Sequence, residues 1–231
     1  MLQQTQTSRV SEKFMEFIKK FPDFNALAKA PLEAVLKVWQ GLGYNRRAIA
    51  LKNIADIIVN NYNEKLPTDL ETLKSFPQIG YNTASSILAF AFNIPTYFIE
   101  TNIRRVYIYF FFQDKKIVYD KDILKVAKKT IDLSNPREWY YGLMDYGVML
   151  KKTHPELNKK SAHYRKQSKF KGSNREIRGE ILKILVKEKA LNEMDIIQQI
   201  DKNPERVKKI LKAMLKEGFI KQNNQHFTIS G

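Results

Sequence analysis

Apolar side chains recur at helical spacing through the first two thirds of the chain. Between residues 46 and 62 one stripe carries Ala50, Leu51, Ile54, Ile57 and Ile58, a spacing that predicts an amphipathic helix. Helices are predicted over residues 10–20, 31–39, 46–62, 68–75, 83–91, 102–112, 120–131 and 136–150, the fourth with a capping box of Thr68 and Glu71. No stretch before residue 150 alternates as a strand does. Residues 1–150 are therefore expected to form an all-α domain.

The pattern changes after residues 172–174, which read Gly-Ser-Asn. Helices are predicted over residues 177–186, 193–200 and 205–217, followed by two short strands around an Asn-Asn turn. Three helices and a hairpin are typical of a winged helix, which we expect over residues 173–231. Winged helices serve both as DNA readers and as protein-docking modules, and periodicity leaves both uses open.

Charge points to a polyanion as partner. The 231 residues include 40 Lys and Arg against 24 Asp and Glu, a net charge of +16. Residues 151–171 are the densest part, with eight basic side chains and one acidic side chain. A solvated linker would have the same composition, so either a linker or a DNA-facing segment is expected over residues 151–172. No apolar run approaches a membrane span and no leader segment is evident, so a cytoplasmic location is expected. We also expect a monomer that associates with the nucleoid.

Residues 75–90, SFPQIGYNTASSILAF, join two predicted helices through a tight turn at Pro77 and Gly80. The unpaired N–H groups of such a turn and of the following helix start suit a phosphate oxygen. An ordinary antiparallel helix pair with a short connector would have the same pattern. The expected DNA-binding residues of this hairpin are Gln78, Ile79, Gly80, Asn82 and Thr83.

Five segments occur in an order that resembles the helix-hairpin-helix base-excision DNA glycosylases, and most closely the adenine-specific mismatch glycosylases. They are MLQQTQTSRV, KVWQGLGYNRRA, FPQIGYNTA, FIETNIRRV and WYYGLMDYGVML. The resemblance covers residues 1–150. It implies an all-α helix-hairpin-helix glycosylase domain whose partner is double-stranded DNA with a mismatched or damaged base.

The resemblance places Glu100 where the family has the acid that faces the deoxyribose of a flipped-out nucleotide. Cleavage of an N-glycosidic bond builds positive charge on the sugar, and a nearby carboxylate stabilises that charge or directs a water. Asn102 matches an asparagine that supports the site in adenine-specific members. The alternative is that Glu100 only complements a helix N-terminus, an effect of about 0.3 to 1 kcal/mol.

Leu2, Gln4 and Tyr44 match positions that wedge into the duplex or fill the space of the extruded base, and Arg46 is a further expected DNA contact. Tyr44 as core packing, and Leu2 and Gln4 as a frayed terminus, are the alternatives. Asn82 stands where members that also cut the backbone carry a Schiff-base lysine, so a monofunctional glycosylase without lyase activity is implied.

Three departures from the family pattern bear on chemistry. The family acid is usually Asp, and Glu100 adds a methylene. The hairpin usually has Gly where Gln78 stands, so either an altered turn or a strained positive φ is expected. The chain has no Cys, which removes the ligands of the family's iron–sulfur cluster, and we expect no cofactor and no metal. His154 and His163 lack partners at ligand spacing and are expected to be surface residues.

In place of the cluster loop, basic residues are expected to face DNA. They are Lys151, Lys152, Lys159, Lys160, Arg165 and Lys166. The family also places a Glu that protonates the leaving adenine just upstream of the segment that matches MLQQTQ. We therefore expect a longer native chain; a different proton donor, or a base that needs no protonation, is the alternative.

The expected function is excision of adenine opposite 8-oxoguanine or guanine in base-excision repair. Excision of thymine or uracil from mismatches is the alternative within the same chemistry. A non-catalytic DNA-binding protein on a glycosylase scaffold, and a helical protein-interaction adaptor, are the alternatives from other classes. The guanine-sensing C-terminal domain of the adenine-specific enzymes is not recognisable in the sequence.

Overall fold

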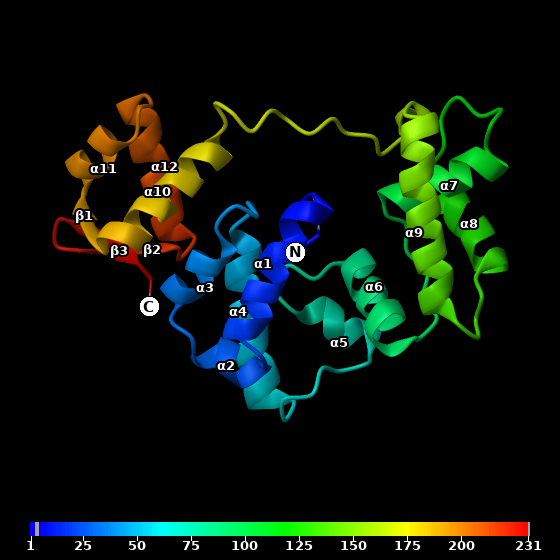
Figure 1. The fold of residues 1–231 in the computed structure, drawn as a ribbon, viewed down its shortest axis with the longest axis horizontal. Coiled ribbons are helices and arrows are strands. Elements are labelled where there is room, and N and C mark those ends of the chain that lie inside the picture. The colour runs from blue at the N-terminus through cyan, green and yellow to red at the C-terminus, as the bar shows by residue number, and fades with distance from the viewer. Residues whose placement is uncertain (3–4, 231) are drawn as a thin grey trace. The chain divides into compact units, whose positions relative to one another are not determined.

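The computed structural model describes residues 1–2 and 5–230 and divides into two compact units (Figure 1). One unit, the N/C unit, consists of Met1–Leu66 together with Ser168–Gly231. The other, the central unit, is Pro67–Gln167. These units divide the chain after Leu66 and Gln167, and the expected domain boundaries at residues 150 and 172 remain a prediction.

Four helices build the first half of the N/C unit: α1 (Thr7–Lys20), α2 (Phe24–Lys29), α3 (Leu32–Trp39) and α4 (Arg46–Asn61). Three of them were predicted, and α1 ends before the Phe21-Pro22 step as expected. The short helix α2 was missed. It begins where the Asp23 carboxylate accepts a hydrogen bond from the Ala26 N–H at 2.7 Å, a side-chain cap that satisfies an otherwise unpaired donor.

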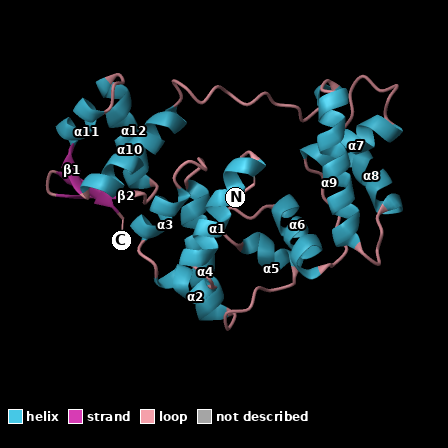
Figure 2. Cartoon of the chain, in the orientation of Figure 1, coloured by secondary structure: helices cyan, strands magenta, loops and turns pink. Residues whose placement is uncertain are grey.

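The segment predicted to be a winged helix, residues 173–230, supplies the second half of this unit and is called the winged-helix segment below. It contains α10 (Asn174–Glu188), β1 (Ala190–Asn192), α11 (Glu193–Gln199), α12 (Pro204–Lys216), β2 (Ile220–Asn223) and β3 (His226–Ile229). Figure 2 shows the strands in magenta. The three helices and the hairpin were predicted. The three-residue strand β1 was not, and it joins an antiparallel sheet of order β1-β3-β2.

A single apolar core joins the two halves of the N/C unit. It includes Val35 and Leu36 of α3 and Ile181 and Leu185 of α10, each no more than 3% exposed. Fully burying an aliphatic side chain stabilises a fold by roughly 1.5–3 kcal/mol. The winged-helix segment is therefore packed onto the N-terminal helices and is not a tethered appendage.

The central unit contains α5 (Leu70–Ser75), α6 (Tyr81–Phe92), α7 (Thr101–Phe111), α8 (Asp120–Thr130), α9 (Pro136–Thr153) and the 3₁₀ turn η1 (Leu157–Lys160). Its core gathers on α7 around Ile103 and Tyr107, which meet Ile123 of α8 and Tyr140 of α9. All five α-helices were predicted. Up to residue 150 the described residues form no strand, apart from a single bridge at Val118 that pairs with Ser161.

The predicted cap of α5 was wrong by one residue. Asp69, not Thr68, caps this helix, and its Oδ1 accepts from the Thr72 N–H and hydroxyl, both at 2.7 Å.

Among the described residues, no helix combines the length and the apolar character that crossing a bilayer requires.

Candidate active site and DNA-contacting surfaces

Glu100 is the N-cap residue of α7. Its Oε1 accepts hydrogen bonds from the backbone N–H groups of Asn102, at 2.5 Å, and Ile103, at 2.9 Å. Such a cap pairs two N–H groups that no helical carbonyl reaches. Both bonds use the same oxygen, and within the described part of the chain no hydrogen bond reaches Oε2. Glu100 therefore does cap the helix, as the alternative interpretation expected. The cap occupies Oε1, and Oε2 stays available for a substrate or a water.

Three side chains fix the extended segment that leads into Glu100. The Asn82 amide donates to the Ile99 carbonyl at 3.0 Å, and the Thr96 hydroxyl donates to the Ser85 carbonyl at 2.7 Å. The Tyr140 hydroxyl donates to the Thr96 carbonyl at 2.6 Å. Phe98 and Ile99 are 2% exposed. Glu100 therefore lies at the end of a chain segment that α6 and α9 hold on both sides.

Asn102 is linked to α9 through Arg105, a residue that the sequence analysis did not identify. Arg105 is 4% exposed, and its Nη1 donates to Asn102 Oδ1 at 2.9 Å and to the Gly147 carbonyl at 2.5 Å. Burial lowers the pKa of Arg105, and the Glu100 carboxylate opposes that shift. Arg105 thus places a buried positive charge behind the candidate catalytic carboxylate.

For the hairpin between α5 and α6 two alternatives were open, an altered turn or a strained positive φ, and the structure has the positive φ. Gln78 has φ of +61°, in the left-handed region that costs a residue with a Cβ about 1–2 kcal/mol. Gly80 precedes the first residue of α6 and supplies no side-chain cap. The start of a helix is a kind of site that suits an anion, and Asn82 and Thr83 lie in the first turn of α6. The Ile79 N–H is bonded to the Phe76 carbonyl at 3.1 Å.

The other expected DNA-contacting residues at the start of the chain lie in the N/C unit. Leu2 is 59% exposed, whereas Gln4 falls outside the described residues. Tyr44 accepts a hydrogen bond on its hydroxyl from Arg175 at 2.7 Å. Arg46 makes a bidentate ion pair with Glu217, at 2.7 and 2.8 Å. The structure therefore joins both Tyr44 and Arg46 to the winged-helix segment, a relationship that no local pattern indicated.

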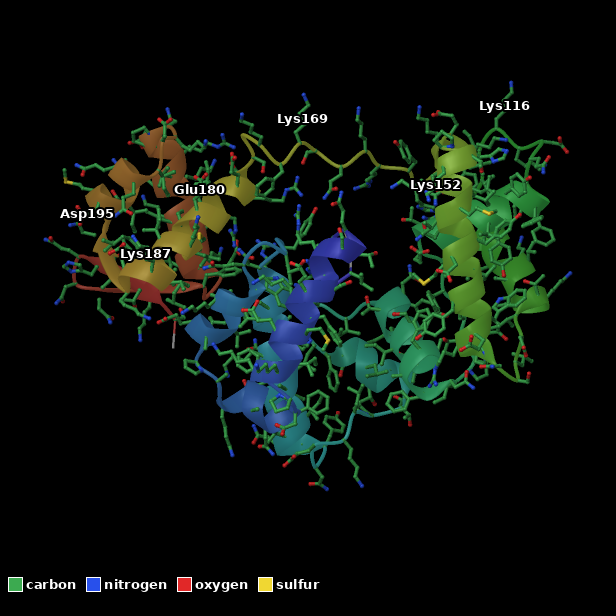
Figure 3. The ribbon with its side chains drawn as sticks, in the orientation of Figure 1. Lys116, Lys152, Lys169, Glu180, Lys187 and Asp195 are labelled. Carbon is green, nitrogen blue, oxygen red and sulfur yellow. The ribbon has the colours of Figure 1, made fainter. Side chains whose placement is uncertain are left out.

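The expected basic surface begins on the last turn of α9, where Lys151 and Lys152 are exposed. Figure 3 labels Lys152 there and Lys169 on the irregular segment before α10. Two neighbours are engaged within the protein: Lys159 pairs with Glu156 at 2.6 Å, and Lys160 donates to the Gln113 carbonyl at 2.6 Å. Arg165 and Lys166 are exposed.

Neither His154 nor His163 belongs to a cluster of three or more possible metal ligands in the part of the chain that the structure describes. The His154 ring packs against Tyr109, with centroids 5.0 Å apart, and its Nδ1 contacts the Thr153 hydroxyl. Across residues 1–2 and 5–230, no cluster of three or more His, Cys, Asp or Glu side chains could hold a metal ion.

Curated relatives agree with the resemblance seen in the sequence. The adenine DNA glycosylase of Buchnera aphidicola subsp. Baizongia pistaciae is 34% identical over 163 residues, which cover 68% of this chain and 46% of the relative. The adenine DNA glycosylase of Mycolicibacterium smegmatis is 40% identical over 106 residues, which cover 46% of this chain and 36% of the relative. The chain thus spans less than half the length of these relatives.

Solved structures share the fold. A thermostable thymine-DNA glycosylase matches with a TM-score of 0.55 and 22% identity, covering 64% of this chain and 70% of the solved chain. A non-covalent endonuclease III–DNA complex matches with a TM-score of 0.53 and 21% identity, covering 65% and 69%. Residues 1–132 match the family model described as HhH-GPD superfamily base excision DNA repair protein. The chain belongs to this superfamily.

Proposed function

We propose that the protein is a monofunctional DNA glycosylase that hydrolyses the N-glycosidic bond of a base extruded from duplex DNA. The observation that carries the proposal is the placement of Glu100. Its Oε1 is fixed by two backbone N–H groups, Oε2 has no hydrogen bond from the described residues, and its backbone is held by α6 and α9. A carboxylate positioned in this way is suited to stabilising developing positive charge.

The proposed reaction breaks the bond between the sugar C1′ and the base nitrogen, and the bonding electron pair leaves with the base. The Glu100 carboxylate stabilises the resulting oxocarbenium-like sugar and orients a water that attacks C1′. Asn102, fixed by Arg105, supports the start of α7 beside the reacting sugar. The products are a free base and an abasic site.

Adenine opposite 8-oxoguanine or guanine is the proposed substrate, because the similar curated proteins are named adenine DNA glycosylases. Thymine or uracil mispaired with guanine is the second candidate. The solved thymine-DNA glycosylase with the same fold favours including these duplexes in the assay. We propose that the protein acts as a monomer on chromosomal DNA and needs no bound cofactor.

Duplex DNA is the proposed partner, and exposed positive charge in each of the two units supports it. The hairpin presents the first turn of α6 to a phosphate, and Lys151 and Lys152 add exposed charge at the end of α9. On α12, the exposed lysines at positions 209, 212 and 216 recur three and four residues apart, on the face opposite the buried Val207, Ile210 and Met214. Such contacts position a duplex without reading its sequence.

The activity test uses labelled duplexes with A opposite 8-oxoguanine, A opposite G, T opposite G and U opposite G, followed by alkali. Strand breaks at the mismatched base are expected with the unaltered protein. They should be absent with Glu100→Gln, which retains the hydrogen-bond acceptor of the cap. Binding without breaks by both proteins would instead support a non-catalytic DNA-binding protein, for which the capping role of Glu100 is sufficient.

The proposed absence of lyase activity rests on Asn82, whose amide cannot form a Schiff base. Borohydride added during the reaction should trap no covalent adduct with the unaltered protein. Asn82→Lys should yield one, because the side chain at position 82 already reaches the carbonyl that precedes Glu100. An adduct formed by the unaltered protein would contradict the monofunctional assignment.

A further inference from the structure

Tyr44 is held by a residue from the opposite end of the chain. It lies in the turn between α3 and α4, and Arg175, in the first turn of α10, donates from Nη1 to the Tyr44 hydroxyl at 2.7 Å. The guanidinium carbon of Arg175 lies 5.3 Å from the centroid of the Tyr44 ring, and that of Arg47 lies 5.4 Å from it. Two cation–π contacts and one charge-assisted hydrogen bond therefore meet at one aromatic side chain.

Arg175 is itself anchored by Ser168, which lies in the irregular segment before α10. Its Nη2 donates to the Ser168 carbonyl at 2.8 Å and contacts the Ser168 hydroxyl at 3.2 Å. A planar guanidinium that is fixed by one nitrogen presents the other in a defined direction. Arg175 can thus restrain the orientation of Tyr44 as well as contact it.

A second contact joins the winged-helix segment to the same turn. Glu217, at the end of α12, accepts a bidentate pair from Arg46, two residues after Tyr44, and another from Arg178 of α10 at 2.5 and 3.1 Å. The side chains of Glu217 and Arg178 are 23% and 19% exposed. The Arg46 side chain is 62% exposed. The partly buried pair with Arg178 therefore fixes the Glu217 carboxylate, and Arg46 reaches this fixed carboxylate from the turn.

The backbone of Tyr44 needs such restraint. Its φ is +47°, a left-handed conformation that costs a bulky residue about 1–2 kcal/mol. Conformations of this kind persist where surrounding contacts over-determine them, and they concentrate at functional sites. The contacts to Arg175, Arg47 and Glu217 surround this turn.

We propose that the winged-helix segment is a positioning device for the base-recognition site, and that Arg175 is the positioning residue that sets the orientation of Tyr44 for contact with the extruded or neighbouring base. The inference rests on the proposed function, because it gives Tyr44 its role at the flipped nucleotide. It assigns the winged helix a task within the glycosylase itself, separate from any DNA contact made by α12.

The test compares Arg175→Met, Tyr44→Phe and the double variant of the full chain, with an Arg206→Met control. Arg206 donates to Asn174 Oδ1 and the Gly172 carbonyl, so its loss perturbs the same segment without touching Tyr44. Single-turnover cleavage of the preferred duplex should fall at least about tenfold for each of the first two variants, as expected when a hydrogen bond to a charged group is removed. The double variant should be no slower than the slower single variant, since both substitutions break the same hydrogen bond between Arg175 and Tyr44.

A second readout does not require cleavage. In the Glu100→Gln background, 2-aminopurine at the mismatch reports base extrusion by its fluorescence, and Arg175→Met should lower this signal while Arg206→Met leaves it unchanged. The proposal would be overturned if the losses of cleavage rate in the two single variants added up in the double variant. It would also be overturned if Arg206→Met lost as much as Arg175→Met, or if Arg175→Met raised the 2-aminopurine signal. A protein that extrudes the base and cleaves no duplex would contradict the proposed function and leave the positioning role measurable.

Discussion

Gly147 of α9 lies directly against Asn102 of α7. A Cβ added to Gly147 would come within 2.5 Å of the Asn102 carbonyl oxygen and 2.6 Å of its Cβ. No real pair of such atoms is this close, so only glycine allows α7 and α9 to approach at this point. The backbone carbonyl of Gly147 also accepts a hydrogen bond from Arg105. The helix crossing and the candidate active site are therefore fixed by the same residue.

Gly147→Ala should destabilise the protein by about 1–3 kcal/mol, because the obstructing atoms belong to backbone and Cβ and cannot rotate away. Gly142, one helical turn and a half earlier in α9, has nothing within 4 Å of an added Cβ, so Gly142→Ala should stabilise by about 0.5–1 kcal/mol. Urea unfolding of both variants measures the difference. Equal stabilities would show that α9 can shift away from Asn102.

Glu100→Asp tests whether the site is built for the longer acid. Asp is one of the preferred helix N-cap residues, so the midpoint of thermal unfolding should not fall. The carboxylate would be withdrawn by about 1 Å, which can cost roughly 10²-fold in rate. Single-turnover cleavage measures this loss. A faster Asp variant would mean that Glu100 is a compromise and not an adapted position.

Gln78→Gly should stabilise the hairpin, since glycine adopts a φ of +61° without the cost of a Cβ. Part of the gain of about 1 kcal/mol is offset by the greater entropy of glycine in the unfolded chain. Gly80→Ala is the matched control, because Gly80 has φ of −93° and open space at Cβ. Gln78→Ala keeps a Cβ at the strained φ. The free energy of unfolding, measured by chemical denaturation, should therefore be higher for Gln78→Gly than for Gln78→Ala, and the reverse order would contradict strain at this turn.

The ion pairs of Glu217 with Arg46 and Arg178 should make the protein less stable in acid. Hydrogen bonds and charge from Arg46 and Arg178 lower the pKa of Glu217 from 4.5 to about 2. A carboxyl group with a lowered folded-state pKa contributes its stability above about pH 4.5, and this contribution is lost as the pH falls toward 2. At about 1.4 kcal/mol per pH unit, the upper limit is about 3 kcal/mol.

Glu217→Gln should therefore lower the free energy of unfolding at pH 7 and reduce its dependence on pH between about 4.5 and 2. Unfolding by urea at several pH values measures both quantities. Glu205→Gln is the control, because Glu205 pairs with Lys208 on the surface and its side chain is 81% exposed. The same pH dependence in Glu217→Gln as in the unaltered protein would contradict the assignment.

The basic segment should account for part of the salt dependence of DNA binding. Reversing Lys151, Lys152, Arg165 and Lys166 to Glu should weaken duplex binding and reduce the slope of log K against log salt by about 0.9 for each phosphate that the segment no longer neutralises. The control reverses Lys115, Lys116, Lys121 and Lys129 and changes the net charge equally. An identical slope in the two variants would indicate a general charge effect and no DNA-facing segment.

Local patterns were sufficient where neighbouring residues decide the structure. The helical stripe of residues 46–62 became α4, and Glu100 caps a helix that periodicity had predicted to begin just after it. The positive φ of Gln78 was one of the two alternatives that the family resemblance left open. The family resemblance also rests on order along the chain, and the comparisons confirmed it. The short elements α2 and β1 were missed because six and three residues carry little periodicity and no start signal was recognised there. The equally short α5 was predicted together with a start signal, the capping box of Thr68 and Glu71.

The sequence by itself thus determined the helical class, the superfamily and the candidate acid. Only the tertiary structure decided that Arg105 joins Asn102 to Gly147, and that Arg175 and Glu217 hold the turn of Tyr44 and Arg46. These partners lie up to 171 positions apart. Helical periodicity reports which face of a helix is buried, whereas the identity of the opposing residue depends on how distant segments pack, and no local spacing encodes that.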